Sequence, residues 1–341
     1  MPVPGWTTLT RRILGSLWIV DGLLQGQPLM FTHAVVLQVF APAAAGNPAL
    51  VQALMRWGMA IWAAHPVVAN GSAEGIQIVI GLLLWHSNRT LWRAGLILSF
   101  AWAMVVWVFG EGLGAVLTRA PTILTGAPGS AIVYAFFSVV LLLATAPAAG
   151  GGRYAHKLLR FGLAAYWGLG AFWQFRPVYF RPLSLLEIVA GNQGLSEPNA
   201  LARGLGAAAE LVGRRPADLN LAMGLLMAVL CVETLTRPRP GAVLTWATLG
   251  FLALIWGIFM DFGVFGGTGT DPNTAPVAAL MMVALVLAGR AATAPASASH
   301  SADGTLIHPP VPYSRPRTGP TFDRRISAEE REDRSGNASR S

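Results

Sequence analysis

Long apolar blocks separated by short basic or Gly/Pro-rich breaks make up most of this chain. Blocks that can cross the roughly 30 Å hydrocarbon core of a bilayer predict membrane-spanning helices. We expect these helices at residues 11–29, 68–85, 94–115, 130–147, 159–177, 217–235, 241–262 and 275–291. The pattern therefore predicts an all-α integral membrane protein with about eight transmembrane helices.

A tandem duplication is indicated when the chain is compared with itself at a shift of about 150 residues. The matched pairs are Trp18 with Trp167, Gln25 with Gln174, Pro28 with Pro177, Phe31 with Phe180 and Trp107 with Trp256, and, after a shift of one, Pro48 with Pro198, Pro66 with Pro216 and Asn70 with Asn220. Four spans per half is an even number. Both copies therefore enter the membrane in the same direction, as parallel repeats.

The repeat divides the chain into four parts. We expect a first four-helix repeat at 1–147, a cytoplasmic linker at 148–158, a second four-helix repeat at 159–291 and a disordered cytoplasmic tail at 292–341. The tail is polar and has almost no aliphatic residues. Such a segment cannot bury enough apolar surface to offset its ordering entropy.

Segment 49–69 is apolar enough to be a further span. Its counterpart at 199–219, however, carries Arg203, Glu210, Arg214, Arg215 and Asp218. Charged groups in the middle of a bilayer cost several kcal/mol each. We therefore expect both segments to form amphipathic helices on the outer surface of the membrane.

The basic residues predict the orientation. Only 12% of residues are charged, the formal net charge is +8, and 54% of residues are apolar. The basic turns lie on one side of the predicted spans and contain Arg11/Arg12, Arg89/Arg93, Arg153/Lys157/Arg160, Arg237/Arg239 and Arg290. By the positive-inside rule both termini are cytoplasmic, in a bacterial-type inner membrane. The expected partner is the lipid bilayer, and no nucleic acid is expected.

The first apolar block has an alternative interpretation. Arg11 and Arg12 precede the apolar run 13–24, as in a signal peptide. No small-residue cleavage site follows, and the block has a counterpart in the second half, so we expect a retained helix. The sole cysteine, Cys231, lies within an apolar block and rules out a disulfide framework.

Two acids that follow matched tryptophans are the strongest site candidates. Glu111 comes shortly after Trp107, and Asp261 comes shortly after Trp256. We expect both carboxylates to face the interface between the halves, where they could bind a cation, relay a proton or hold a polar headgroup. The alternative is that both acids simply reach interfacial water beside an aromatic belt.

Asp21 and Glu74 are also candidates, but glycines stand at their matched positions, so any site that they form belongs to the first half alone. Together with His33 and His65 they supply the ligand types of a metal centre. Their spacings match no metal motif, and the sequence therefore predicts no metal site.

Some polar residues favour structural roles. Gln25 and Gln174 are matched amides that could hydrogen-bond a neighbouring helix or a ligand. Glu233 precedes Arg237 by one helical turn, which predicts an i,i+4 ion pair.

Two predicted outer loops, 110–129 and 262–275, are rich in Gly, Thr and Pro. Glycine lets a backbone fold closely upon itself. These loops could therefore form a lid or a re-entrant binding surface, and the alternative is a pair of exposed turns.

The first half resembles a known family in outline. A helix that begins at Arg11-Arg12-Ile13-Leu14-Gly15 is followed by a long outer segment, by Glu74-Gly75 and Gly81-Leu82-Leu83-Leu84, and by a basic turn. This unit, most visible over 11–107, resembles the four-helix DoxX/DoxD-like membrane proteins. The resemblance implies a membrane subunit linked to quinone-coupled sulfur oxidation, with Glu74 as the one matched residue. The fused duplication and the Gly-rich loop after Trp107 depart from the family pattern.

Three functions remain open. The first is a quinone- or small-ligand-linked subunit of a membrane redox complex, with its site on the outer side between the halves. The second is a transporter or channel for a small solute or ion, and the third is a non-catalytic assembly partner of another membrane subunit. No Walker loop, nucleophile elbow or HExxH motif occurs in a suitable context, so we do not expect the isolated chain to be an enzyme.

Overall fold

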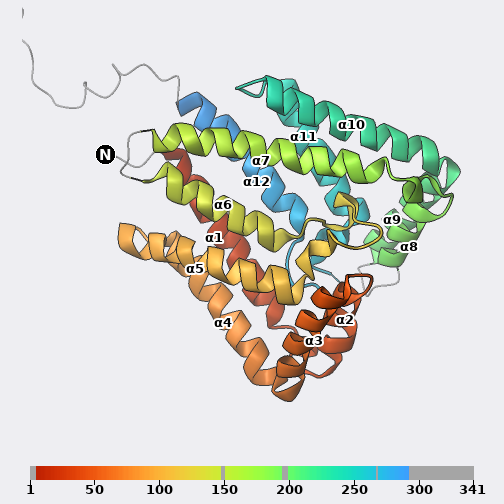
Figure 1. The fold of residues 1–341 in the computed structure, drawn as a ribbon, viewed down its shortest axis with the longest axis horizontal. Helices are drawn as coiled ribbons and strands as arrows, with labels where there is room; N and C mark the ends of the chain where they lie inside the picture. The colour runs from red at the N-terminus through yellow and green to blue at the C-terminus, as the bar shows by residue number, and fades with distance from the viewer. Residues whose placement is uncertain (1–4, 147–149, 194–198, 266–267, 292–341) are drawn as a thin grey trace, which may run out of the picture. The chain divides into compact units, whose positions relative to one another are not determined.

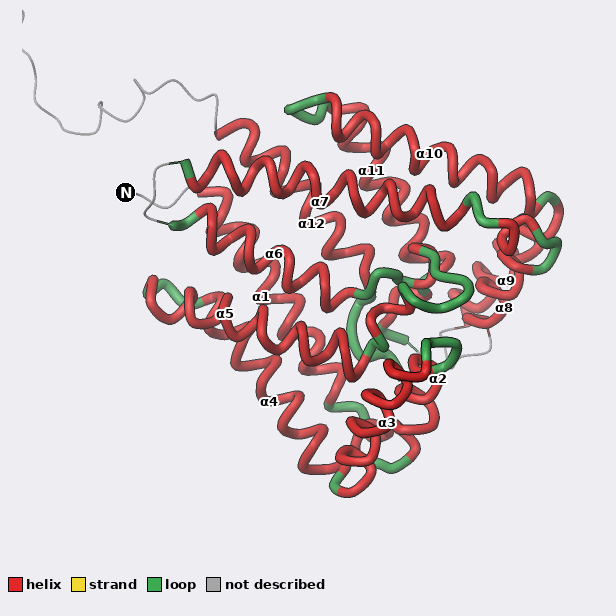
Figure 2. Tube along the Cα trace, in the orientation of Figure 1, coloured by secondary structure: helices red, strands yellow, loops and turns green. Residues whose placement is uncertain are grey.

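The computed structural model describes residues 5–146, 150–193, 199–265 and 268–291. Within these ranges the regular structure is entirely helical (Figure 2). The predicted tail at 292–341 lies outside the described residues.

The α-helices follow the apolar blocks of the sequence closely (Figure 1). They are α1 (Gly5–Gln25), α2 (Ala41–Ala44), α3 (Ala49–Ala64), α4 (Pro66–Trp85), α5 (Arg89–Val105), α6 (Ser130–Ala144), α7 (Gly151–Gln174), α8 (Ser184–Gln193), α9 (Asn199–Arg214), α10 (Pro216–Thr236), α11 (Ala242–Leu254) and α12 (Thr274–Ala291). The π-helical turns Val106–Gly110 and Ile255–Phe259 extend α5 and α11.

Five helices of the described residues are long and apolar enough to cross a membrane. They are α4, α5 with its π-helical turn, α10, α11 with its π-helical turn, and α12. The chain therefore has the composition and secondary structure of an all-α membrane protein. Helix α6 is apolar but shorter, with 15 residues, and α1 contains three charged residues, Arg11, Arg12 and Asp21. The count of eight spans stays a prediction.

Helices α1, α6, α7 and α12 form the centre of the bundle. Helix α12 packs against the other three, and α6 packs against both α1 and α7. The burial of α12 agrees with this position. In its apolar stretch 61% of the residues are buried, whereas 28–33% are buried in the other candidate spans. Helix α4 packs on α1, and α10 packs on α7, and the two ribbons of each pair lie side by side in Figure 1.

Close contact between α1 and α4 depends on glycine. A Cβ atom added to Gly81 would lie 2.5 Å from Ile19 Cγ1 and 2.6 Å from the carbonyl oxygen of Gly15. Small residues at such crossings let two helix backbones approach closely, as in many membrane helix pairs.

A buried polar chain connects α1, α5 and α6 in the first half. Trp18 Nε1 donates to Ser99 Oγ at 2.8 Å, and the Ser99 and Ser138 hydroxyl oxygens are 2.8 Å apart. All three side chains are at most 2% exposed. Because a buried polar group costs free energy when it lacks a partner, this chain favours one packing of the three helices.

The two halves of the chain contain corresponding elements. Helices α3 and α9 both have 16 residues, and each is followed by a helix that begins with proline, at Pro66 and Pro216. In addition, Trp107 Nε1 and Trp256 Nε1 each donate to a proline carbonyl at 2.8 Å. These correspondences support the tandem duplication, which stays a prediction.

Some helix boundaries differ from the expected ones. Helix α3 ends at Ala64, and residues 66–69 of the doubtful segment belong to α4, because Pro66 suits the first turn of a new helix. Helix α7 begins at Gly151 and so extends into the segment 148–158 that the sequence analysis assigns to a linker.

Basic side chains bind carbonyl oxygens at the C-terminal ends of α4 and α6. Arg11 donates to the carbonyl oxygens of Leu84 and His86, and Arg89 Nη2 donates to that of Thr145 at 2.7 Å. Carbonyls at a helix C-terminus lack partners within the helix and carry partial negative charge, which favours cations there.

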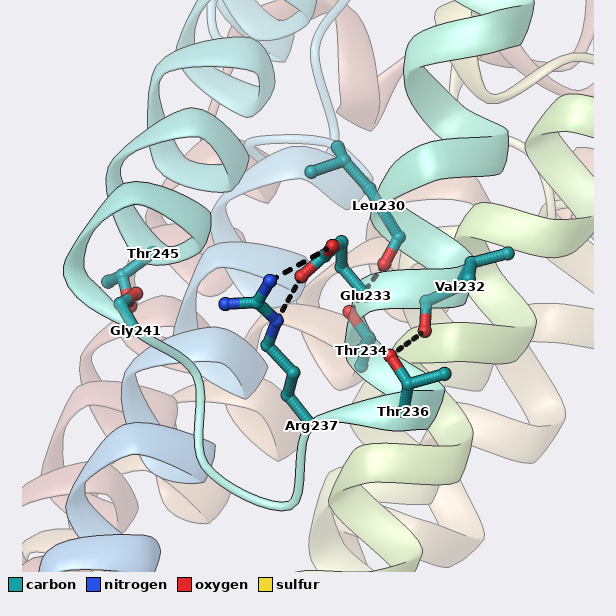
Figure 3. Close-up of polar contacts among 8 residues, drawn as sticks. All are labelled: Leu230, Val232, Glu233, Thr234, Thr236, Arg237, Gly241 and Thr245. Carbon is teal, nitrogen blue, oxygen red and sulfur yellow. Dashed lines mark hydrogen bonds and ion pairs between the residues drawn. The ribbon is translucent and has the colours of Figure 1, made fainter.

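The predicted pair of Glu233 and Arg237 is confirmed as an ion pair at the end of α10 (Figure 3).

Candidate functional site

The loops of the two halves interlock at the end of the bundle where α6 and α12 begin. Gln27 Nε2 donates to the carbonyl oxygen of Gly269 at 2.8 Å. Conversely, Thr122, in the loop of the first half, donates from Oγ1 to Oε1 of Gln174 in the second half at 3.0 Å. Each loop is thus anchored on the other half of the chain.

Glu111 lies within this interlocked region, directly after the π-helical turn that extends α5. Its Oε1 atom accepts hydrogen bonds from Ser130 Oγ at 2.7 Å and from the backbone N–H of Ala131 at 3.1 Å. These donors belong to the first turn of α6, where unpaired N–H groups favour an anion. The other oxygen, Oε2, is buried and has no hydrogen-bond partner among the described residues.

Asp271 brings a second carboxylate from the other half of the chain. Its Oδ1 atom accepts from the backbone N–H of Asn273 at 2.6 Å, just before α12, and its Oδ2 atom accepts from Thr270 Oγ1 at 3.3 Å. Asp271 lines the same cavity as Glu111 and Ser130. The two acids therefore belong to one site.

Burial shifts the proton affinity of both acids. Glu111 follows the last residue of the candidate span Arg89–Gly110. Burial, and secondarily the charge of Asp271, raise the pKa of Glu111 to about 7, although hydrogen bonds from Ser130 and Ala131 act in the opposite direction. Burial also raises the pKa of Asp271. Neither acid belongs to an ion pair among the described residues, so a shared proton or a bound cation is the compensation that remains.

Two cavities adjoin at the acids, and both are lined by Glu111 and Asp271. The first, of about 290 Å³, has a mixed polar and apolar lining that includes Thr125, Gly129 and Ser130. The second, of about 120 Å³, is mostly apolar and extends between α3, α4 and α5.

Three residues that line the second cavity each carry an unpaired polar atom. Trp62 Nε1, Trp102 Nε1 and Gln77 Oε1 are buried and have no hydrogen-bond partner among the described residues. Buried donors and acceptors are paired in most proteins, because an unmade hydrogen bond costs roughly 1–3 kcal/mol. Two donors and one acceptor thus remain for a ligand or for water.

Two glycines let the loop close around Glu111. Gly129 has a φ of +100°, and a Cβ atom there would lie 2.1 Å from Glu111 Oε2. Gly114 has a φ of +59°, and a Cβ atom there would lie 1.7 Å from the carbonyl oxygen of Pro128. The glycine content of this loop therefore has a structural cause at the site itself.

The structure brings some of the other candidates to this site. Gln25 lines the second cavity. Asp21 is 2% exposed, accepts a hydrogen bond from Tyr134 Oη at 3.4 Å, and interacts electrostatically with Asp271 and Glu111. The carboxyl groups of Asp21, Glu111 and Asp271, which come from three parts of the chain, thus interact electrostatically.

Other candidates lie elsewhere. Asp261 is buried beside the π-helical turn of α11 but lines neither cavity, so its pairing with Glu111 stays a prediction. Gln174 is fully buried and is bound by Thr122 and Asn220, which favours a structural role.

Glu74 is partly buried and lines neither cavity. His33 and His65 are exposed, and the described residues contain no group of acids, histidines and cysteines that could hold a metal.

Sequence reasoning missed Asp271 as a site residue. Alignment of the prolines before α6 and α12 places Ala127 opposite Asp271, so no duplicated acid marks the position. The sequence Asp271-Pro272-Asn273-Thr274 is typical of a helix start, and this signal could have indicated a carboxylate beside the N-terminus of α12. Trp62 and Trp102 could not be distinguished from the other tryptophans, because their unpaired N–H groups become evident only in three dimensions.

Comparisons of this chain with protein-family models, with curated proteins and with solved structures each find no match. The resemblance to DoxX/DoxD-like proteins therefore stays a prediction.

Proposed function

We propose that this chain is a multi-pass membrane protein that binds a small, partly apolar ring, such as a quinone head group, beside Glu111 and Asp271. In this proposal it serves as the ligand-binding subunit of a membrane redox complex. The observation that carries the proposal is the second cavity, whose mostly apolar lining includes three residues with an unpaired polar atom, together with the two acids.

The size of the second cavity is consistent with a single ring. A cavity of about 150 Å³ in another protein holds one benzene molecule, and this cavity measures about 120 Å³. It adjoins the larger cavity at residues that line both, among them Gly110 and Thr270. Substituents of the bound ring could therefore extend toward the larger cavity.

The polar atoms match the chemistry of a quinone. Its two carbonyl oxygens accept hydrogen bonds, which Trp62 Nε1 and Trp102 Nε1 can donate. The reduced form carries hydroxyl groups, for which Gln77 Oε1 and Glu111 Oε2 are acceptors. Oxidation of such a quinol releases two electrons, which would pass to a partner subunit, and two protons. Glu111, with a pKa near neutrality, is suited to accept one of them.

The proposal includes a membrane arrangement. Eight spans in two parallel repeats, with α3 and α9 on the outer surface, place the loops that carry Glu111 and Asp271 outside an inner membrane and both termini in the cytoplasm. Basic turns at the opposite helix ends support this orientation. Exposed apolar side chains on α4, α5, α10 and α11 support contact with lipid.

A proton- or cation-coupled carrier is the second candidate. The interaction of Asp21, within α1, with Glu111 and Asp271 favours it, because a series of acids that leads into a bundle is a known feature of ion pathways. Ion-dependent flux in vesicles, unaffected by quinones, would favour the carrier over the quinone-binding subunit.

The test of the proposed function is equilibrium binding of a short-chain benzoquinone to the purified full-length chain in neutral detergent, measured by calorimetry. We expect one saturable site. The substitution Trp102→Phe keeps most of the ring bulk but removes the N–H donor, and it should weaken binding by roughly three- to tenfold.

The matched control is Trp246→Phe, which changes an indole that is 72% exposed and lines neither cavity at the acids. It should leave the affinity unchanged. Absence of saturable binding, or equal loss in both variants, would contradict the proposed function.

A further inference from the structure

Two amides at corresponding places in the two halves of the chain have different partners. Gln25 is the last residue of α1, and Gln174 is the last residue of α7. The backbone carbonyl oxygen of each accepts a hydrogen bond from the fifth residue of a helix that begins with proline. The donors are Asn70 Nδ2 at 2.7 Å and Asn220 Nδ2 at 3.0 Å. This backbone contact is therefore the same in both pairs.

In the second half the side chains of the pair also bind each other. Gln174 Nε2 donates to Asn220 Oδ1, and Gln174 Oε1 accepts from Thr122 Oγ1 at 3.0 Å. Both Gln174 and Asn220 are fully buried. Buried amides that are paired with each other across two helices stabilise the packing of those helices. The pair of Gln174 and Asn220 therefore has a structural role.

In the first half the corresponding side-chain bond is not made. Asn70 is fully buried, and its Oδ1 atom has no hydrogen-bond partner among the described residues. The Gln25 side chain therefore does not donate to Asn70, and Gln25 lines the second cavity. Because an amide offers both donors and an acceptor, Gln25 can bind a polar group of a ligand in that cavity.

The other polar residues of the second cavity have apolar counterparts in the second half. The counterparts are found by counting from the start of α3 and α9, from the start of α4 and α10, and back from Trp107 and Trp256. The pairs are Trp62 with Val212, Gln77 with Met227 and Trp102 with Phe251. The three counterparts are at most 7% exposed and belong to the hydrophobic core. Valine and phenylalanine side chains form no hydrogen bonds, and methionine is only a weak acceptor.

We propose that Gln25 is a direct ligand-binding residue of the second cavity, and that the chain carries one such site, in its first half. The second half is then a structural copy, in which Gln174 binds Asn220 and core side chains fill the corresponding positions. This inference rests on the proposed function and extends it to the orientation of the ring. Gln25 Nε2 donates to a carbonyl oxygen of the quinone, and Gln25 Oε1 accepts from a hydroxyl group of the quinol.

The experiment compares Gln25→Met with the matched variant Gln174→Met. Calorimetry measures binding of a short-chain benzoquinone to the purified full-length chain in neutral detergent, and a thermal melt measures stability. We expect one quinone per wild-type chain. Gln25→Met keeps the side-chain length but removes the amide, and it should weaken binding by roughly three- to tenfold. Its melting temperature should stay within about 2 °C of the wild type, because Asn70 binds the backbone carbonyl, which the substitution keeps.

Gln174→Met should have the opposite profile. It leaves the buried Asn220 Oδ1 without its donor, so the melting temperature should fall by roughly 5 °C. The affinity of the folded variant for benzoquinone should stay within about twofold of the wild type.

Gln77→Met is a second test that does not depend on the stability of either variant. It introduces the residue that stands at the corresponding position of the second half, and it removes a buried oxygen that has no partner among the described residues. Binding should weaken by roughly three- to tenfold, and the melting temperature should stay the same or rise.

The outcomes separate this inference from the proposed function. Absence of saturable binding by the wild type would contradict both. Saturable wild-type binding that Gln25→Met and Gln77→Met leave unchanged would overturn only the role of these amides. Two quinones per chain, or an equal loss of affinity in Gln25→Met and Gln174→Met, would overturn the assignment of the site to the first half.

Discussion

Glu111 Oε1 lies 2.7 Å from Ser130 Oγ, so the acid that follows α5 binds the first residue of α6. One carboxylate oxygen thus has a structural role, while the other is buried and has no hydrogen-bond partner among the described residues. Asp271, from the other half of the chain, lines the same cavity as Ser130. A substitution at Glu111 is therefore expected to change both stability and binding, and its pH dependence separates the two effects.

The first prediction concerns pH and stability. The pKa of folded Glu111 is raised from 4.5 to about 7, so the folded state binds more protons than the unfolded state between these values. The contribution of Glu111 to stability is therefore complete below about pH 4.5 and is lost as pH rises through about 7. Glu111→Gln should remove this part of the pH dependence and raise the melting temperature at pH 8 by about a few degrees.

Melting temperatures in detergent between pH 4.5 and 8 test this prediction. Glu187→Gln, which changes an exposed acid on α8, is the control and should keep the wild-type pH profile. A Glu111→Gln profile parallel to that of the wild type would show that Glu111 does not titrate in this range.

The second prediction concerns the loop that encloses Glu111. Gly129→Ala adds a Cβ atom 2.1 Å from Glu111 Oε2 at a φ of +100°. The carboxylate must move, so we expect a loss of about 1–3 kcal/mol in stability together with weaker quinone binding. Gly250→Ala, on α11 with nothing within 4 Å of the added atom, should be neutral or slightly stabilising. Wild-type binding by Gly129→Ala would contradict the geometry of the site.

The third prediction concerns packing between α1 and α4. Gly81→Ala places a Cβ atom 2.6 Å from the carbonyl oxygen of Gly15 and should force the two helices apart, at a cost of about 1–3 kcal/mol. Gly75→Ala on the same helix adds an atom with nothing within 4 Å and should leave stability within about 0.5 kcal/mol of the wild type. Comparable melting temperatures for the two variants would mean that the helices do not approach closely at Gly81.

The hydrophobic pattern was sufficient to predict an all-α fold with several long apolar helices. Apolar blocks marked the long helices, and the spacing of Glu233 and Arg237 predicted an ion pair that depends only on local helix geometry. Pro66 shows where the predicted boundary was wrong. The sequence analysis assigned residues 66–69 to the surface segment 49–69, but proline begins α4 there.

The site was less accessible to sequence reasoning. Glu111 could be chosen because it follows a matched tryptophan, whereas Asp271 is an acid in a loop whose position depends on contacts with the other half, such as that between Gln27 and Gly269. The unpaired N–H of Trp102 likewise results from tertiary packing. Neither property has a local signature in the chain.

The fourth prediction concerns topology. Single cysteines at positions 153 and 239 should be protected from an impermeant thiol reagent in intact cells, and cysteines at positions 33 and 125 should be labelled. The native residues at all four positions are exposed. Cys231 is replaced first, because it is the only native thiol. Labelling at position 153 from outside would contradict the eight-span arrangement and the orientation that the basic turns predict.

The most direct test of the carboxylate site is a double-mutant cycle on benzoquinone binding with Glu111→Gln, Asp271→Asn and the combined variant, and with Asp261→Asn as the control. If both acids act on one ligand, each single variant should weaken binding by roughly tenfold. The combined variant should then be weaker than the wild type by about twentyfold instead of the hundredfold that additive effects would give, which corresponds to a coupling of about 1 kcal/mol. Asp261→Asn should bind as the wild type does. Purely additive effects, or wild-type affinity in the combined variant, would contradict a shared site at Glu111 and Asp271.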